Sequence, residues 1–236
     1  FNYSMSLAFN RDLEADPRRH YSPQQLLDYA FAQPSNFPPG QGYEYSNTNA
    51  VLLGQVVEKV SGKTLPAYVR EHIAVPLGLS HTSFPETNTI PDPHAQGYTQ
   101  LTPTGPLIDS TDWSPSWASW AGAMVSTLED LRIWVPALAT GQLLKPATQE
   151  QRLQTAAMPP VPDDIRYGLG IFDARGWIGH NGSIPGYQTL AIYSPAEQTT
   201  VVALLNTDVA KQPAHPSTLF GTAITKVISP DHVFLL

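Results

Sequence analysis

Two short polar motifs carry side chains that can transfer protons and hold a substrate. Tyr45-Ser46-Asn47 follows a run of turn-forming residues and directly precedes a helical pattern of apolar residues. His180-Asn181-Gly182-Ser183 follows a short predicted strand and precedes another turn. Tyrosine and histidine act as general acids and bases, and a regular element beside them fixes their position. The same residue types also cap helices and form turns, so a structural role is the alternative for both motifs.

The first motif lies in a part of the chain whose pattern is helical as far as about residue 160. Ser22 followed by Pro23 predicts an N-cap with proline at the first helical position, and the helix is predicted to continue over residues 24–32. Thr127 is the predicted N-cap of another helix. Residues 79–118 are predicted to form a long irregular segment, a feature usual for functional loops. Apolar spacing predicts three further helices, over residues 48–60, 65–74 and 146–157.

The second motif lies where the pattern changes to short strands. Strands are predicted over residues 167–172, 177–180, 188–193 and 200–205. Their short links predict an antiparallel meander, and the apolar run of the last strand predicts burial on both faces. A helix over residues 216–228 follows, with one apolar face made of Leu219, Phe220, Ala223, Ile224 and Val227.

These patterns predict an α+β chain in two parts. Residues 1–165 are predicted to form a mostly helical subdomain, and residues 166–236 to form antiparallel strands with a C-terminal helix.

Composition excludes several classes of site. The 236 residues carry a formal charge of −7 without a basic run, which argues against a nucleic-acid surface. There is no cysteine, so disulfides, thiolate metal sites and a cysteine nucleophile are excluded. The seven histidines show no metal-ligand spacing, and no phosphate loop or dinucleotide fingerprint is present. We therefore expect no metal and no cofactor.

Taken in order, the motifs resemble those of the serine β-lactamase and penicillin-binding DD-peptidase superfamily. That family carries Ser-x-x-Lys, then Tyr-x-Asn, then Lys-Thr-Gly or His-x-Gly. Tyr45-Ser46-Asn47 is similar to the second motif and His180-Asn181-Gly182 to the third, in its histidine form. The segments 77–84, 121–131 and 167–170 are similar to family segments in the same order. The histidine form resembles the class C-like branch of soluble D-alanyl-D-alanine carboxypeptidases and esterases.

The resemblance implies a β-lactamase/transpeptidase-like fold and acyl transfer to a serine, followed by hydrolysis. Substrates would be D-Ala-D-Ala peptides of the cell wall, β-lactams or esters. Tyr45 would move the proton of the nucleophile and of the leaving group. Asn47 would orient the substrate amide, and His180 would line the opposite wall and hydrogen-bond toward Tyr45.

The resemblance also implies the residues that hold the substrate. Gly182 would let the substrate lie against its strand, because a Cβ atom there would block it. The backbone N–H of Ser183 would be half of an oxyanion hole, and its hydroxyl could meet a substrate carboxylate. Trp120, with Trp113 and Trp117, would wall the cleft.

The chain departs from the family pattern in one respect, because no serine has a lysine three residues later. Only 44 residues precede Tyr45, so we expect the nucleophile, its lysine, the N-terminal helix and the first strands to precede Phe1. On this interpretation the chain is a C-terminal portion that is inactive alone. The alternatives are a non-catalytic relative that binds peptidoglycan or β-lactams, and one half of a nicked enzyme that stays assembled.

Partners and location follow from the same interpretation. Besides a small-molecule or peptidoglycan-peptide substrate, the expected partners are an N-terminal fragment of the same protein or a second copy. The open edge of the strand over residues 200–205 would take either one. The resemblance implies a periplasmic, extracellular or cell-envelope location.

Overall fold

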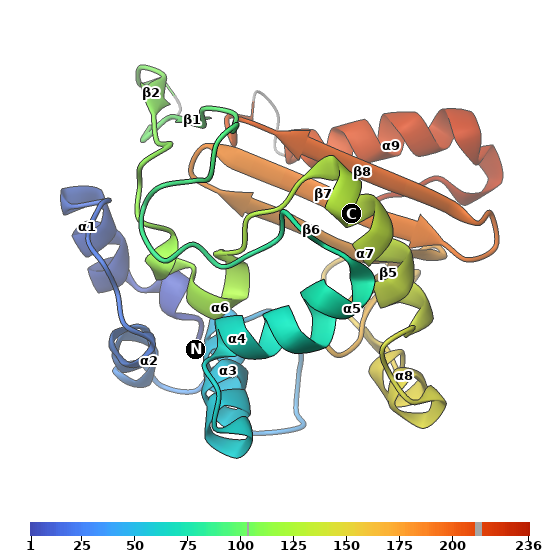
Figure 1. The fold of residues 1–236 in the computed structure, drawn as a ribbon, viewed down its shortest axis with the longest axis horizontal. Coiled ribbons are helices and arrows are strands. Elements are labelled where there is room, and N and C mark those ends of the chain that lie inside the picture. Colours follow the sequence, from blue (N-terminus) through green and yellow to red (C-terminus); the bar gives the residue numbers. More distant parts are fainter. Residues whose placement is uncertain (103, 211–213) are drawn as a thin grey trace. The chain divides into compact units, whose positions relative to one another are not determined.

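A computed structural model describes residues 1–102, 104–210 and 214–236 (Figure 1). Backbone contacts divide the chain into two compact units. The first unit comprises Phe1–His94 and Thr111–Ser126, and the second comprises Ala95–Ser110 and Thr127–Leu236. This division differs from the predicted boundary at residue 165, because the helices after Thr127 belong with the sheet.

The first unit is helical. Its elements are the 3₁₀ turn η1 (Tyr3–Met5), α1 (Leu7–Ala15), α2 (Pro23–Phe31), α3 (Asn47–Ser61), α4 (Leu65–Val69), the π-helical turn η2 (Arg70–Ala74), α5 (Val75–Leu77), η3 (Pro115–Trp117) and α6 (Ser119–Gly122). Its core is a cluster of buried side chains, Tyr3, Phe9, Tyr21, Leu26, Leu27, Ala30 and Val51. The helix predicted over residues 65–74 consists of α4 and the π turn η2, and it continues directly into α5.

Local capping signals account for the helix ends. Ser22 Oγ accepts from the Gln25 N–H at 3.2 Å, and Gln25 Oε1 accepts from the Ser22 N–H at 2.8 Å, which is a complete capping box. At the C-terminal end of α3, Gly62 adopts φ 70°, the left-handed conformation that ends a helix most easily when the residue is glycine. The start of α2 is thereby confirmed within one residue.

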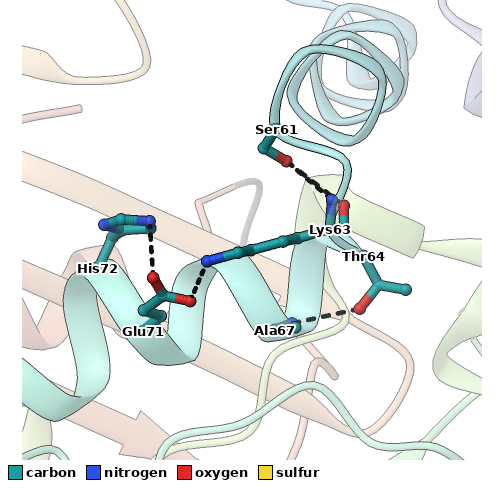
Figure 2. Close-up of polar contacts among 6 residues, drawn as sticks. All are labelled: Ser61, Lys63, Thr64, Ala67, Glu71 and His72. Atoms are coloured by element: carbon teal, nitrogen blue, oxygen red, sulfur yellow. Dashed lines mark hydrogen bonds and ion pairs between the residues drawn. The ribbon is translucent and has the colours of Figure 1, made fainter.

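The link from α3 to α4 carries a surface network of charges (Figure 2). Thr64 caps α4 by accepting from the Ala67 N–H at 3.4 Å. Lys63 pairs with Glu71, and His72 Nε2 lies 3.6 Å from Glu71 Oε1. The hydrogen bond from Lys63 lowers the pKa of Glu71. The side chains of both pairs are exposed to solvent, so the pairs add little to the free energy of unfolding.

The second unit is built on a six-stranded antiparallel sheet whose strands follow one another in chain order (Figure 1). The strands are β3 (Ala156–Ala157), β4 (Ile165–Tyr167), β5 (Phe172–Ala174), β6 (Trp177–Ile184), β7 (Tyr187–Ser194) and β8 (Thr199–Leu205). Helices α7 (Leu128–Thr140) and α9 (Pro216–Ile228) pack against β7 and β8. The remaining elements are α8 (Pro146–Arg152), η4 (Pro230–His232) and the two-residue strands β1 (Tyr98–Thr99) and β2 (Ile108–Asp109).

The predicted meander is confirmed, but several boundaries differ. The strand predicted over 167–172 is two strands, because β4 ends at Tyr167 and β5 begins at Phe172. Gly170 lies between them with φ 68°, a conformation that suits a turn. The helix predicted to reach residue 157 ends at Arg152. Strand β6 continues to Ile184, so the second motif lies inside a strand and not after one.

Helix α9 has the predicted bounds but presents the opposite face to the sheet. Its buried residues are small or polar: Ser217, Thr218, Gly221 and Thr225. A Cβ atom at Gly221 would lie 2.2 Å from Leu190 Cδ2, so the missing side chain lets the helix approach the sheet closely. The predicted apolar face is exposed, with Val227 at 80% and Phe220 at 55%. Strand β8 also differs from the prediction, since Leu204 is 41% exposed.

Candidate functional site

The first motif is tied to the beginning of the chain. Ser46 is the N-cap residue of α3, and Asn47 is its first helical residue. The Asn47 N–H donates to Asn2 Oδ1 at 3.2 Å, and Asn47 Nδ2 donates to Ser4 Oγ at 3.3 Å. The segment around η1 therefore holds the first turn of α3 and fixes where Asn47 points.

Thr48 extends this bracing. Its hydroxyl donates to the Phe1 carbonyl at 2.9 Å and accepts from the Tyr3 N–H at 3.1 Å. The hydroxyl of Tyr3, which is fully buried, donates to the Trp117 carbonyl at 2.7 Å. Sequence reasoning missed this role, because an irregular segment has no periodicity from which contacts over 45 residues could be inferred.

Tyr45 is half exposed, with 43% of its surface accessible. Burial of the rest raises the pKa of Tyr45. Burial also raises the pKa of Tyr3 and the pKa of Tyr43, and Tyr45 adds a smaller contribution to both. A tyrosine with a raised pKa keeps its phenolic proton at neutral pH. The acid/base role of Tyr45 stays a prediction.

Trp120 has a clear packing role. A Cβ atom at Gly54 of α3 would lie 2.1 Å from Trp120 Cε3, so the ring occupies the space beside that glycine. Trp117 and Trp120 pack against the buried cluster of the first unit and are partly exposed. A contact between Trp120 and substrate stays a prediction.

The second motif lies along a half-paired stretch of β6. Strand β7 pairs with β6 from Ile178 to Ile184, whereas β5 pairs with Trp177–Gly179. Among the described residues, the edge of β6 over 181–184 that faces away from β7 therefore has no strand partner. Alternate residues of an antiparallel strand direct both N–H and C=O to the same edge, so this edge presents backbone donors and acceptors.

His180 is fixed in one tautomer by its neighbours. Its Nδ1 lies 2.6 Å from the Asn181 carbonyl oxygen, and its Nε2 lies 2.9 Å from the Tyr167 hydroxyl. A carbonyl oxygen can only accept, so Nδ1 carries the proton and Nε2 accepts from Tyr167. Burial lowers the pKa of His180, which keeps the ring neutral at pH 7. The expected hydrogen bond toward Tyr45 stays a prediction.

Gly182 and Ser183 are exposed. A Cβ atom at Gly182 would have its nearest neighbour at Thr189 Cβ, 3.9 Å away, which is an ordinary contact. A Cβ atom at Gly179, in the same strand, would lie 2.1 Å from the Ala191 carbonyl oxygen. Packing within the described chain therefore requires a glycine at position 179 but not at position 182.

No metal site is found within residues 1–102, 104–210 and 214–236: no group of three or more His, Asp or Glu side chains there could hold an ion. Two of the described histidines each lie beside a single carboxylate: His94 Nδ1 is 3.0 Å from Asp92 Oδ1, and His72 Nε2 is 3.6 Å from Glu71 Oε1. Across the same residues, no helix combines the length and the apolar character needed to cross a membrane.

Known proteins share this architecture. The model of the family described as Beta-lactamase matches residues 1–220. The structure of a D-stereospecific amidohydrolase from Streptomyces sp. is 30% identical, with a TM-score of 0.84 over 90% of this chain and 66% of that chain. The D-amino acid amidase from Ochrobactrum anthropi SV3, complexed with L-phenylalanine amide, is 27% identical, with a TM-score of 0.73 over 83% of this chain and 59% of that chain.

The curated relatives are longer proteins, of which this chain matches only a part. Protein flp from Staphylococcus aureus (strain MW2) is 26% identical over 171 residues, which are 71% of this chain and 34% of that protein. The putative penicillin-binding protein PbpX from Bacillus subtilis (strain 168) is 26% identical over 190 residues, 78% of this chain and 45% of that protein. The chain thus spans less than half of either relative.

The antiparallel sheet and its helices define an α+β fold of the β-lactamase/transpeptidase type, a class whose members are serine hydrolases. The family match covers most of the chain. The chain belongs to the Beta-lactamase family.

The contrast between the two glycines of β6 gives a test of the second motif. Gly182→Ala should leave the free energy of unfolding within about 1 kcal/mol of the original, because the site is open and alanine suits a strand slightly better than glycine. Gly179→Ala should lower it by at least about 1–3 kcal/mol, since the new methyl group would overlap backbone atoms. Urea denaturation of the two variants measures both values, and equal destabilisation would show that Gly182 is a packing residue.

Proposed function

We propose that the natural protein is a serine hydrolase that forms an acyl-enzyme with D-Ala-D-Ala peptides, β-lactams or esters and then hydrolyses it. The observation that carries the proposal is the exposed glycine at the half-paired edge of β6, where packing leaves space for a ligand backbone. The relatives named as a D-stereospecific amidohydrolase and a D-amino acid amidase support a substrate with a D-configured residue.

In this mechanism Tyr45 exchanges the proton of the nucleophile and of the leaving group. A serine hydroxyl attacks once a base has taken its proton. Burial raises the pKa of Tyr45, so Tyr45 ionises at neutral pH only beside a positive charge. Burial also keeps His180 neutral, so His180 does not supply that charge. We assign that charge to the lysine of a Ser-x-x-Lys motif, which the 236 residues do not contain.

The other proposed roles rest on backbone geometry. Asn47, whose N–H and side-chain NH₂ are bonded to Asn2 and Ser4, is proposed to orient the substrate amide from the first turn of α3. The N–H of Ser183 serves as one oxyanion donor, and Gly182 lets the substrate lie along β6. Loss of one such donor typically slows catalysis about 10²–10³-fold.

The absence of Ser-x-x-Lys from the 236 residues also favours a second candidate, a relative that binds peptidoglycan or β-lactams without turnover. The two candidates differ in whether a covalent adduct forms with a β-lactam.

Tyr45→Phe in the natural full-length protein should slow acylation by a fluorescent penicillin about 10²–10⁴-fold, the usual contribution of a positioned acid or base. The ring, which makes the packing contacts, is kept. Stopped-flow labelling measures the rate, with Tyr43→Phe in the same loop as the matched control. A near-normal rate for Tyr45→Phe would remove Tyr45 from the mechanism.

A partner strand is the second part of the proposal. Strand β8 is the last strand of the sheet among the described residues, and the exposed apolar face of α9 lies beside it. An apolar edge strand tends to pair with another strand. We propose that a strand of the same protein outside the 236 residues takes this place, and that a second copy replaces it when the chain is alone.

The isolated chain should therefore associate with itself in a concentration-dependent way, as measured by analytical ultracentrifugation. Leu204→Lys should weaken this association at least about tenfold, because a charge on an edge strand opposes pairing. Leu101→Lys, at an exposed position outside the sheet, is the matched control. A monomer at all concentrations, or equal effects of both variants, would contradict pairing through β8.

A further inference from the structure

A buried glutamine links Ser183 of the second motif to the start of α9. Gln188 is 1% exposed and lies opposite Ser183 in the β6–β7 register. Its Oε1 accepts from the Ser217 N–H at 3.1 Å, while its Nε2 lies 3.3 Å from Ser183 Oγ and 3.0 Å from His215 Nδ1. A buried amide is costly unless it is paired, and here both of its ends have partners.

The orientation of this amide follows from its backbone partner. A backbone N–H can only donate, so the atom that faces Ser217 must be the oxygen Oε1. The NH₂ group of Gln188 therefore faces Ser183 and His215, and its two hydrogens have one acceptor each. It follows that Ser183 Oγ and His215 Nδ1 both accept from Gln188.

This network sets the polarity of the Ser183 hydroxyl. Because Oγ accepts from Gln188, the hydroxyl hydrogen does not point toward Gln188 and can be donated to a group at the exposed side of β6. The bonds form one directed chain: the N–H at the start of α9 donates to Gln188, Gln188 donates to Ser183, and Ser183 is left to donate outward. Hydrogen bonds arranged head to tail polarise one another in the same sense, which strengthens the outward donor.

We propose that Gln188 is a positioning residue that turns the Ser183 hydroxyl into an outward donor and thereby selects substrates with a carboxylate at that point. A carboxylate accepts hydrogen bonds and gains from a donor backed by a polarised chain. An uncharged carboxamide at the same point accepts more weakly. The inference rests on the proposed function, and it narrows the proposed substrates to peptides that end in a free carboxylate.

Gln188→Glu reverses the polarity of the chain while preserving its shape. One carboxylate oxygen still accepts from the Ser217 N–H, and the other now accepts from Ser183, whose hydroxyl hydrogen turns inward, and from His215, whose proton must then be on Nδ1. The test uses the natural full-length protein with an N-acyl-D-alanyl-D-alanine and its C-terminal amide as substrates. The measured quantity is the ratio of kcat/KM for the carboxylate to kcat/KM for the amide.

We expect Gln188→Glu to lower this ratio at least about tenfold, the lower end for a hydrogen bond to a charged group. The substitution also adds a negative charge, so the same change is made in a Ser183→Ala background, where charge repulsion persists but the hydroxyl is gone. The fall should be much smaller there, because the two residues act as one unit. An equal fall in both backgrounds would overturn the proposal.

A measurement that needs no activity separates this inference from the proposed function. In NMR spectra, Ser183→Ala should shift one of the two side-chain NH₂ hydrogens of Gln188 and leave the other, which is bonded to His215, nearly unchanged. If neither signal responds, the Gln188–Ser183 link is disproved whatever the enzyme does. If one NH₂ signal responds but neither substrate is turned over, the proposed function fails. The hydrogen bond from Gln188 to Ser183 is then confirmed, but selection of carboxylate substrates is disproved.

Discussion

The pairing of β6 with its two neighbours is the constraint on which the second motif depends. Strand β7 fixes the register of β6 from Ile178 to Ile184, whereas β5 stops opposite Gly179. A shift of one residue would turn every side chain to the other face, so this register alone places Ser183 beside Gln188. Because β5 pairs only as far as Gly179, the edge of residues 181–184 that faces away from β7 has no strand partner among the described residues.

A second constraint acts in the first unit, where the start of α3 is held by residues at the beginning of the chain. Asn47 and Thr48 are bonded to Asn2, Ser4, Phe1 and Tyr3. Both proton-transfer candidates are neutral at pH 7, since burial raises the pKa of Tyr45 and lowers that of His180. In the proposed mechanism, therefore, the charge that activates the serine comes from another group.

Local signals made much of the fold predictable. The starts of α2 and α7 follow from Ser22 and Thr127, whose side chains accept from N–H groups three residues later. The turn between β7 and β8 and the bounds of α9 were also predictable, because turn residues and apolar spacing are local, whereas the turn between β4 and β5 was missed. The face of α9 was not: Gly221 permits a closer approach to Leu190 than any apolar side chain would, and that depends on the sheet. The partners of the site residues, Tyr167 for His180 and Gln188 for Ser183, follow from strand register, which periodicity does not encode.

Tyr45 and the edge of β6 are proposed to serve a serine outside the 236 residues. Labelling of the natural full-length protein with a β-lactam, followed by mass spectrometry of its peptides, tests this directly. The expected result is one acylated serine, within a Ser-x-x-Lys sequence that lies outside residues 1–236, and no adduct on the isolated chain. A stable adduct on any serine between Phe1 and Leu236 would contradict it.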